Sequence, residues 1–225
     1  RYDLISLLKE FGAHSDVYLT LHDNLESYDE VVANAEDNHS IPVVTVAGED
    51  ANRPIIMGAV FRSGLQKVVV PFFDYGIPVE YELARSISTV AKGTRKTIGI
   101  IDSDANILGG YSFASGRPTR IPQQSFITEL QKQYRVVNVD AEQEISTTEY
   151  ELLFIAQPSS LENMKLTNIL RALQSGVPAV IFEDPRPETI SAPGTGVPRQ
   201  SIEQMMGLPG QPQQKGSISR LWDLL

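Results

Sequence analysis

The sequence predicts an α/β protein with a parallel sheet, preceded by a smaller α/β unit that contains a β-hairpin. In the second part of the chain, short apolar runs alternate with longer segments of helical periodicity, which is typical of a parallel sheet with helical crossovers. In the first part, two β-rich runs, IIMGAVFRSG and QKVVVPFF, are separated by a turn that contains glycine. We therefore divide the chain into a unit at residues 1–74 and a larger domain at residues 75–225.

The first unit is expected to fold as helix, strand, helix, strand and hairpin. Leu4, Leu8 and Phe11 fall on one helical face, and Gly12 is a suitable stop for that helix. Alternating apolar residues predict the first strand, and apolar residues at helical spacing predict the second helix. The expected elements are a helix at 2–12, a strand at 16–22, a helix near 28–35, a strand at 41–47 and a hairpin at 55–72.

The larger domain is expected to begin with a helix and to continue with β-α steps. Pro78 suits the first turn of that helix, and Gly93 ends it. Apolar runs predict the strands that follow, and stripes of apolar residues at helical spacing predict the helices between them. The expected elements are strands at 97–101, 135–139, 151–156 and 178–183, helices at 122–134 and up to Gly176, and a long exposed Pro/Gly-rich loop at 185–218 with a short helix near 200–206.

The composition argues against several classes of protein. The formal net charge is −9, from 19 Lys and Arg against 28 Asp and Glu, and no basic stripe is present to neutralise a nucleic acid. The absence of cysteine excludes disulfides, cysteine zinc sites and thiol nucleophiles. No apolar run approaches the ~20 residues of a membrane span. Because the chain begins at Arg1 and ends in the apolar RLWDLL, we expect that flanking membrane helices have been removed.

The run TIGIIDSDANILGGYS places Asp102 and Asp104 directly after an apolar strand. Ligands of open α/β sheets bind beyond the carboxyl ends of strands, so this is the first candidate site. The pattern resembles the nucleophile loop of haloacid-dehalogenase-type phosphatases, in which one Asp attacks phosphorus, the second handles the proton and Mg²⁺ offsets the charge. Glu183 or Asp184 would then bind the metal, and Ser159 would contact phosphate. The lysine that such chemistry requires at a later strand end is missing, and the plainer interpretation is that the aspartates cap a turn.

The remaining candidates are weaker. The loop ILGGYSFASGRP is rich in glycine but lacks the spacings that hold phosphates, so it is expected to be a loop above the strand ends. Arg117 and Arg120 would meet an anion there or would simply be solvated. The three histidines are too scattered in the sequence to indicate a metal site.

A series of segments carries a more specific signal: VVVPFFDYGIPVEYELARSI, TIGIIDS, FITELQKQYRVVNVD, YELLFIAQPSSL, ILRALQSGVPAVIFEDP and LWDLL. It resembles the auxiliary, substrate-binding-like component of uncharacterised ABC transport systems of the gliding-motility type, over the whole chain and most strongly over residues 68–185. The resemblance implies an extracytoplasmic domain held between membrane helices, with an ABC permease and ATPase as partners. It also implies a flavodoxin-like, class I amidotransferase-like second half. No catalytic residue is transferred, and glutaminase chemistry is excluded because there is no thiol.

We therefore expect a non-enzymatic, membrane-anchored accessory domain on the extracytoplasmic, periplasmic side, which acts by contact with a protein or a small ligand. Two alternatives stay open: a Mg²⁺-dependent phosphohydrolase that uses Asp102 and Asp104, and a free small-molecule-binding domain. No metal, cofactor or nucleic-acid partner is expected. The residues expected on the contact surface, a rim at the carboxyl ends of the strands, are Asp102, Asp104, Arg117, Arg120, Ser159, Asp184 and Arg186.

Overall fold

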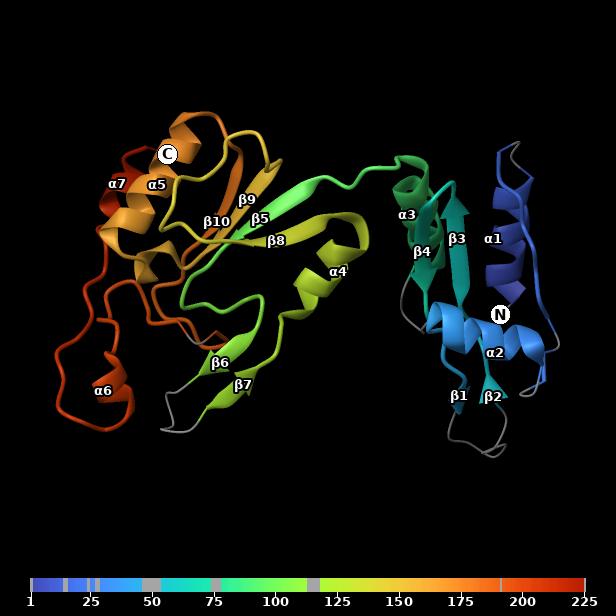
Figure 1. The fold of residues 1–225 in the computed structure, drawn as a ribbon, viewed down its shortest axis with the longest axis horizontal. Coiled ribbons are helices and arrows are strands. Elements are labelled where there is room, and N and C mark those ends of the chain that lie inside the picture. Colours follow the sequence, from blue (N-terminus) through green and yellow to red (C-terminus); the bar gives the residue numbers. More distant parts are fainter. Residues whose placement is uncertain are drawn as a thin grey trace. The chain divides into compact units, whose positions relative to one another are not determined.

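The chain folds into two compact units, Arg1–Thr94 and Arg95–Leu225. Each unit combines helices with strands (Figure 1). The computed structural model describes residues 2–13, 16–23, 25–26, 29–45, 54–73, 78–112, 118–190 and 192–224.

The first unit contains an antiparallel hairpin. β3 (Ala59–Ser63) and β4 (Gln66–Val70) pair along their whole length. Gly64 lies in the turn between them with a φ of 55°, a backbone conformation that glycine adopts without strain. The hairpin predicted at residues 55–72 is thereby confirmed. The other elements of this unit are α1 (Tyr2–Gly12), α2 (Glu30–His39), the short antiparallel pair of β1 (Val44–Thr45) with β2 (Pro54–Ile55), and α3 (Val79–Ala91).

The strand predicted at residues 16–22 is wrong. Residues 16–23 form neither helix nor strand, and Tyr18 is 98% exposed. Alternation of apolar residues is not sufficient for a strand, because its backbone N–H and C=O groups also need a neighbouring strand. The strand expected at 41–47 is represented by the two residues of β1, and its last two residues lie outside the described part of the chain.

Helix α3 belongs to the first unit by its packing. Leu83 is fully buried and packs with Val70 and Phe73, which lie at the end of the hairpin. An amphipathic helix that follows a hairpin buries its apolar stripe on the nearest sheet face. The unit therefore extends to Thr94, whereas the sequence suggested a join after residue 74. The division of the chain into domains after residue 74 stays a prediction.

The second unit is built on a four-stranded parallel sheet in the order β10-β9-β5-β8. The positions and parallel pairing of all four strands agree with the sequence prediction. β5 is central, and the strands that follow it along the chain pair first on one side of it and then on the other. The strands are β5 (Thr97–Ile101), β8 (Arg135–Val139), β9 (Leu152–Ala156) and β10 (Ala179–Phe182), and the principal helices are α4 (Ser125–Gln133) and α5 (Asn163–Gln174).

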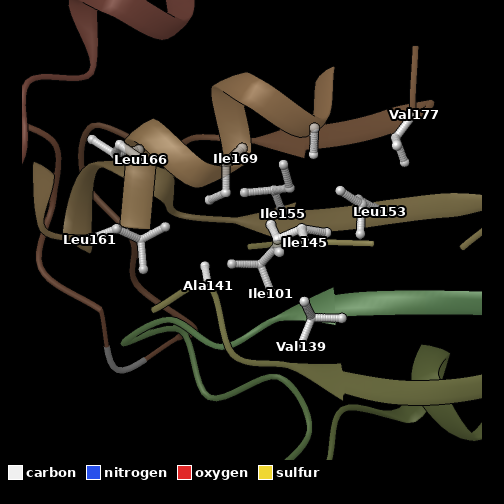
Figure 2. Close-up of a cluster of buried hydrophobic side chains, with 11 residues drawn as sticks. Ile101, Val139, Ala141, Ile145, Leu153, Ile155, Leu161, Leu166, Ile169 and Val177 are labelled. Carbon is white, nitrogen blue, oxygen red and sulfur yellow. The ribbon is translucent and has the colours of Figure 1, made fainter. Parts of the chain in front are cut away.

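The two faces of this sheet bury different residues of the same strands. On one face, Leu153 and Ile155 of β9 pack with Ile169 of α5 in a cluster of buried aliphatic side chains (Figure 2). On the other face, Ile98 and Ile100 of β5 pack with α4. Because successive strand residues point to opposite faces, a near-continuous apolar run is what a sheet covered on both sides requires. The second unit thus has helix, sheet and helix layers.

The connection from β8 to β9 crosses β5 without a helix. Residues 140–151 form turns instead, and Ala141 and Ile145 are buried against the face that α5 covers. Asn168 of α5 holds this connection, since its side-chain amide donates hydrogen bonds to the carbonyls of Ala141 at 2.9 Å and Glu142 at 3.2 Å. The expected β-α alternation is therefore incomplete at this one crossover.

A short hairpin was not predicted. β6 (Gly110–Ser112) and β7 (Thr119–Ile121) pair within the segment that the sequence indicated as an irregular loop.

A row of stacked rings lies across the α4 side of the sheet, where Phe154 stands 5.2 Å from Phe126 and 5.1 Å from Phe182 between ring centroids. Phe182, on the edge strand β10, is 55% exposed.

Candidate functional site

The strand order places a topological switch point at the carboxyl ends of β5 and β9. β8 lies on one side of β5, and β9 lies on the other. The chain leaves β5 toward β8 and leaves β9 toward β10, so the loops after β5 and β9 run in opposite directions and separate. Open α/β sheets bind ligands in the crevice formed at such a point. Here the crevice lies between residues 102–106, after β5, and residues 157–162, after β9.

A polar hollow of about 220 Å³ occupies this position. Its lining carries three carboxylates and two cationic side chains, which gives it a mixed charge. One of the cations comes from a distant part of the chain. The lining residues are Asp102, Ser103, Asp104, Asn106, Ser160, Leu161, Glu162, Lys165 and Arg199.

The turn after β5 is held by its middle residue and by the loop after β9. The hydroxyl of Ser103 donates to the carbonyl of Ala156 at 2.7 Å and accepts the N–H of Ala105 at 3.3 Å. The N–H of Asp104 donates to the hydroxyl of Ser160 at 3.3 Å. The Asp-Ser-Asp sequence therefore connects the ends of two neighbouring strands, and Asp102 remains exposed beside the hollow.

Asp104 forms a two-point ion pair with Arg199. The guanidinium Nε lies 2.6 Å from Oδ2 and Nη2 lies 2.8 Å from Oδ1, which is the geometry of a fork matched to a carboxylate. Glu162 lies 3.7 Å from Nη1 of the same arginine. The side chains of Arg199 and Asp104 are 20% and 30% exposed, so water reaches the pair. The sequence offered no sign of this contact, because its partners are 95 residues apart.

A second polar group of contacts joins β9 to β10 and involves Gln157 and Glu183. Gln157 is 1% exposed and has a φ of 51°. Its Nε2 lies within 2.7 Å of the carbonyl of Asp184 and 3.1 Å of the carbonyl of Pro193, and its Oε1 accepts the N–H of Asp184 at 3.0 Å. Glu183 accepts hydrogen bonds from Gln157, from the N–H of Ser159 and from the hydroxyl of Thr195. These contacts satisfy polar groups that would otherwise be buried without partners.

Lys215, near the C-terminus, binds the backbone of the segment that contains Thr195. Its ammonium group donates to the carbonyls of Gly194 at 2.9 Å, Thr195 at 3.1 Å and Val197 at 2.9 Å, so each of its three protons has an acceptor. Burial lowers the pKa of Lys215 below its usual value, and the nearby carboxylates of Glu183 and Asp104 act against this shift. The Pro/Gly-rich segment expected to be an exposed loop is thus tied down along part of its length.

The structure brings some of the predicted rim residues together. Asp102 and Asp104 line the hollow. Ser159 is 2% exposed, and among the described residues its hydroxyl has no hydrogen-bond partner. Asp184 and Arg186 lie in one exposed turn, where the carboxylate of Asp184 accepts the N–H of Arg186 at 2.8 Å.

The arginines predicted beside the glycine-rich loop are not brought to the hollow. Arg120 is exposed on β7 and is not one of the lining residues. Arg117 lies outside the described residues. A contact role for any of the predicted rim residues stays a prediction.

The carboxylate of Asp104 in the hollow is already paired. Asp104, which would handle the proton in a phosphohydrolase, shares its carboxylate between two donor atoms of Arg199. Across the described ranges, no three His, Cys, Asp or Glu side chains gather in a way that would hold a metal ion.

None of the helices described is both long and apolar enough to cross a bilayer.

The second unit is therefore an α/β domain whose switch point carries a polar hollow crossed by an internal ion pair. A family model described as an ABC-type uncharacterized transport system matches residues 95–210 and begins at the first residue of this unit. The chain belongs to this family of auxiliary components, which supports an accessory role in an ABC transport system. No curated protein and no solved structure matches the chain.

Proposed function

We propose that the protein is a non-enzymatic accessory domain of an ABC transport system of the gliding-motility type, which acts by binding a protein or ligand at the carboxyl-end rim of its sheet. The observation that carries the proposal is the internal pairing at the switch point. Arg199 neutralises Asp104, and Glu183 accepts the N–H of Ser159. Asp104, which would handle the proton, and Glu183, which would bind a metal, are thus already engaged, while Asp102 and Arg186 on the rim remain exposed.

The architecture fits this role. The strand order along the chain matches the first four strands of a flavodoxin-like sheet, and we infer a flavodoxin-like, class I amidotransferase-like fold for the second unit. In such a sheet the carboxyl-end loops are the part free to vary, and exposed loops on a rigid sheet are the usual place for recognition. The mixed charge of the rim favours specific contacts that depend on ionic strength.

The partners in this proposal are the permease and ATPase subunits of the same system, with a small ligand as an additional partner. We infer that the domain is membrane-anchored by flanking helices and faces the extracytoplasmic, periplasmic side. The family to which the chain belongs supports the association with a transport system. Protease protection of the full gene product in intact cells and in opened cells tests the location. We expect added protease to digest this domain only after the outer membrane has been permeabilised. Protection of the domain in both conditions would contradict the periplasmic location.

The binding surface is tested by reversing exposed rim charges. We expect Arg120→Glu combined with Arg186→Glu to weaken co-purification of the permease and ATPase subunits at low ionic strength. The matched control is Lys96→Glu combined with Arg135→Glu, which makes the same change in charge at the amino ends of β5 and β8. Circular dichroism verifies that both variants are folded. Equal binding by the rim variant and the control variant would move the contact surface away from the rim.

Catalysis is tested on the purified chain with phosphate esters and Mg²⁺. We expect no turnover, because Asp104 is held by Arg199 and Lys165, the lysine that lines the hollow, pairs with Glu142 at 3.3 Å. Hydrolysis that disappears in the Asp102→Asn variant would instead support the phosphohydrolase and overturn the proposal.

A further inference from the structure

Residues 192–216, which we call the strap, return across the carboxyl end of the sheet after β10 and end before α7 (Ser219–Trp222). We propose that the strap is a cover for the switch-point hollow, held shut by the Arg199–Asp104 ion pair, and that it opens as one piece to expose the hollow to a partner. The geometry points to this because the strap is bound to itself along its length and to the sheet at a few separate places.

The internal contacts of the strap join its two arms. Lys215, near its end, donates to the carbonyls of Gly194, Thr195 and Val197, near its beginning. Further in, the N–H of Gln213 donates to the carbonyl of Arg199 at 2.9 Å, and the two residues form a β-bridge. A loop whose ends are close together and whose own groups satisfy one another is a compact unit that keeps its shape when it moves.

The short helix α6 (Ile202–Met205) lies within the strap and is held by strap residues. The hydroxyl of Ser201 accepts the N–H of Gln204 at 3.4 Å, and the side-chain carbonyl of Gln204 accepts the N–H of Ser201 at 3.1 Å. This reciprocal pair satisfies two of the N–H groups that the beginning of a helix leaves without partners. Opening of the strap therefore does not require this helix to unfold.

The contacts between the strap and the rest of the domain lie at its ends and at one point in its middle. At one end, Pro193 and Thr195 bind Gln157 and Glu183. At the other end, the N–H of Gly216 donates to the carbonyl of Leu161 at 2.6 Å. Between these ends, Arg199 binds Asp104. The ends are placed to act as hinges, and the ion pair is placed to act as a latch.

The latch is suited to release. An ion pair whose side chains are 20% and 30% exposed is reached by water and salt, so it is easier to separate than a fully buried one. Separation frees a planar guanidinium and a carboxylate, each of which binds a complementary group at two points. The use of this opening by a transport partner rests on the function proposed above, whereas the opening itself belongs to the isolated chain and can be measured there.

Hydrogen–deuterium exchange of the full chain, analysed by mass spectrometry, tests the latch. In the Asp104→Asn variant, we expect peptides within residues 192–216 to exchange about tenfold faster, because loss of a charge-assisted pair of hydrogen bonds raises the population of the open strap. The matched control is Glu151→Gln, which removes the carboxylate of another ion pair in the same unit, that with Lys96 at 3.0 Å. We expect the control to leave exchange of the strap unchanged.

Two further measurements make the test independent of a single variant. Arg199→Gln should accelerate hydrogen exchange of the strap as Asp104→Asn does. The double variant Asp104→Lys with Arg199→Glu, which swaps the two charges, should restore part of the protection of the strap from exchange. High salt should move the wild-type strap toward the behaviour of Asp104→Asn. Unchanged exchange of the strap in both single variants would overturn the latch. Equal acceleration throughout the second unit would also overturn it, because the pair would then stabilise the whole domain. Neither result would contradict the proposed function, which is tested separately by co-purification of the permease and ATPase subunits.

Discussion

Replacement of Gln157 by alanine should destabilise the second unit far more than a comparable replacement at its surface. The variant removes the acceptor of the N–H of Asp184, a part-buried hydrogen bond whose loss costs about 0.5–1.5 kcal/mol. The carbonyls of Asp184 and Pro193 each lose a donor, at roughly 0.5–1.5 kcal/mol apiece. Glu183 keeps the hydrogen bonds from Ser159 and Thr195, so its loss is small. We expect a total of about 2–4 kcal/mol.

The backbone at this position does not change the result. Gln157 has a φ of 51°, but alanine is strained there in much the same way, so the cost cancels between the two proteins. The Gln123→Ala variant is the matched control. Its side-chain amide also makes two hydrogen bonds, to Thr128 at 3.2 Å and Gln131 at 3.1 Å, but the residue is exposed. Water replaces those bonds, and the expected cost is below about 0.5 kcal/mol.

Urea unfolding followed by fluorescence measures the difference. Trp222 is the only tryptophan in the sequence and lies in α7 of the second unit, so its emission reports on that unit. With slopes of about 1–3 kcal/mol per molar urea, the midpoint for Gln157→Ala should fall by at least about 0.5 M relative to the control. Equal midpoints for Gln157→Ala and Gln123→Ala would refute the assignment of Gln157 as the residue that ties β9 to β10.

Three other variants test the packing described here. Gly99→Ala should cost about 1–3 kcal/mol in urea unfolding, because its Cβ would lie 2.7 Å from Val139 and 2.9 Å from Tyr150. Asn168→Ala should cost about 1–3 kcal/mol by the same assay, because the buried carbonyl of Ala141 and the carbonyl of Glu142 lose their donor. Burial and the carboxylate of Glu149 raise the pKa of Tyr150 above its usual value. The protonated phenol therefore contributes fully to the stability of the fold below about pH 10, and this contribution is lost as the pH rises through the pKa of the folded state. Alkaline unfolding should therefore show a smaller pH dependence in Tyr150→Phe, and an unchanged pH dependence would contradict the assignment.

The sheet of the second unit was predictable because its strands carry local evidence. The runs ending in Ile101 and Ala156 are apolar on both faces, and turn-forming residues bound them. Local evidence failed for residues 16–22, whose alternation is equally clear, because no strand among the described residues pairs with them. Local pattern therefore indicates which segments are able to form strands, and tertiary pairing decides which of them do so.

The candidate site was predictable in place but not in its contacts. Asp102 and Asp104 were found because they follow a strand, and the strand order then put them at the switch point. Arg199 was missed because its position within a Pro/Gly-rich segment gives no indication of a partner 95 residues away. No role was predicted for Gln157. Its φ of 51° and the hydrogen bonds that depend on it are set by the folded backbone and have no sequence signature.

The position of β10 at the margin of the sheet has a consequence for how the domain behaves at high concentration. One side of the strand pairs with β9, and in the described part of the chain no strand pairs with the other side. The sequence AVIF of this strand has no charge, and Val180 and Phe182 are 37% and 55% exposed. Uncharged open margins are where natural sheets add to one another and begin to aggregate. Pro178 on one side and Glu183 on the other limit the accessible stretch to four residues, which keeps this hazard small without removing it.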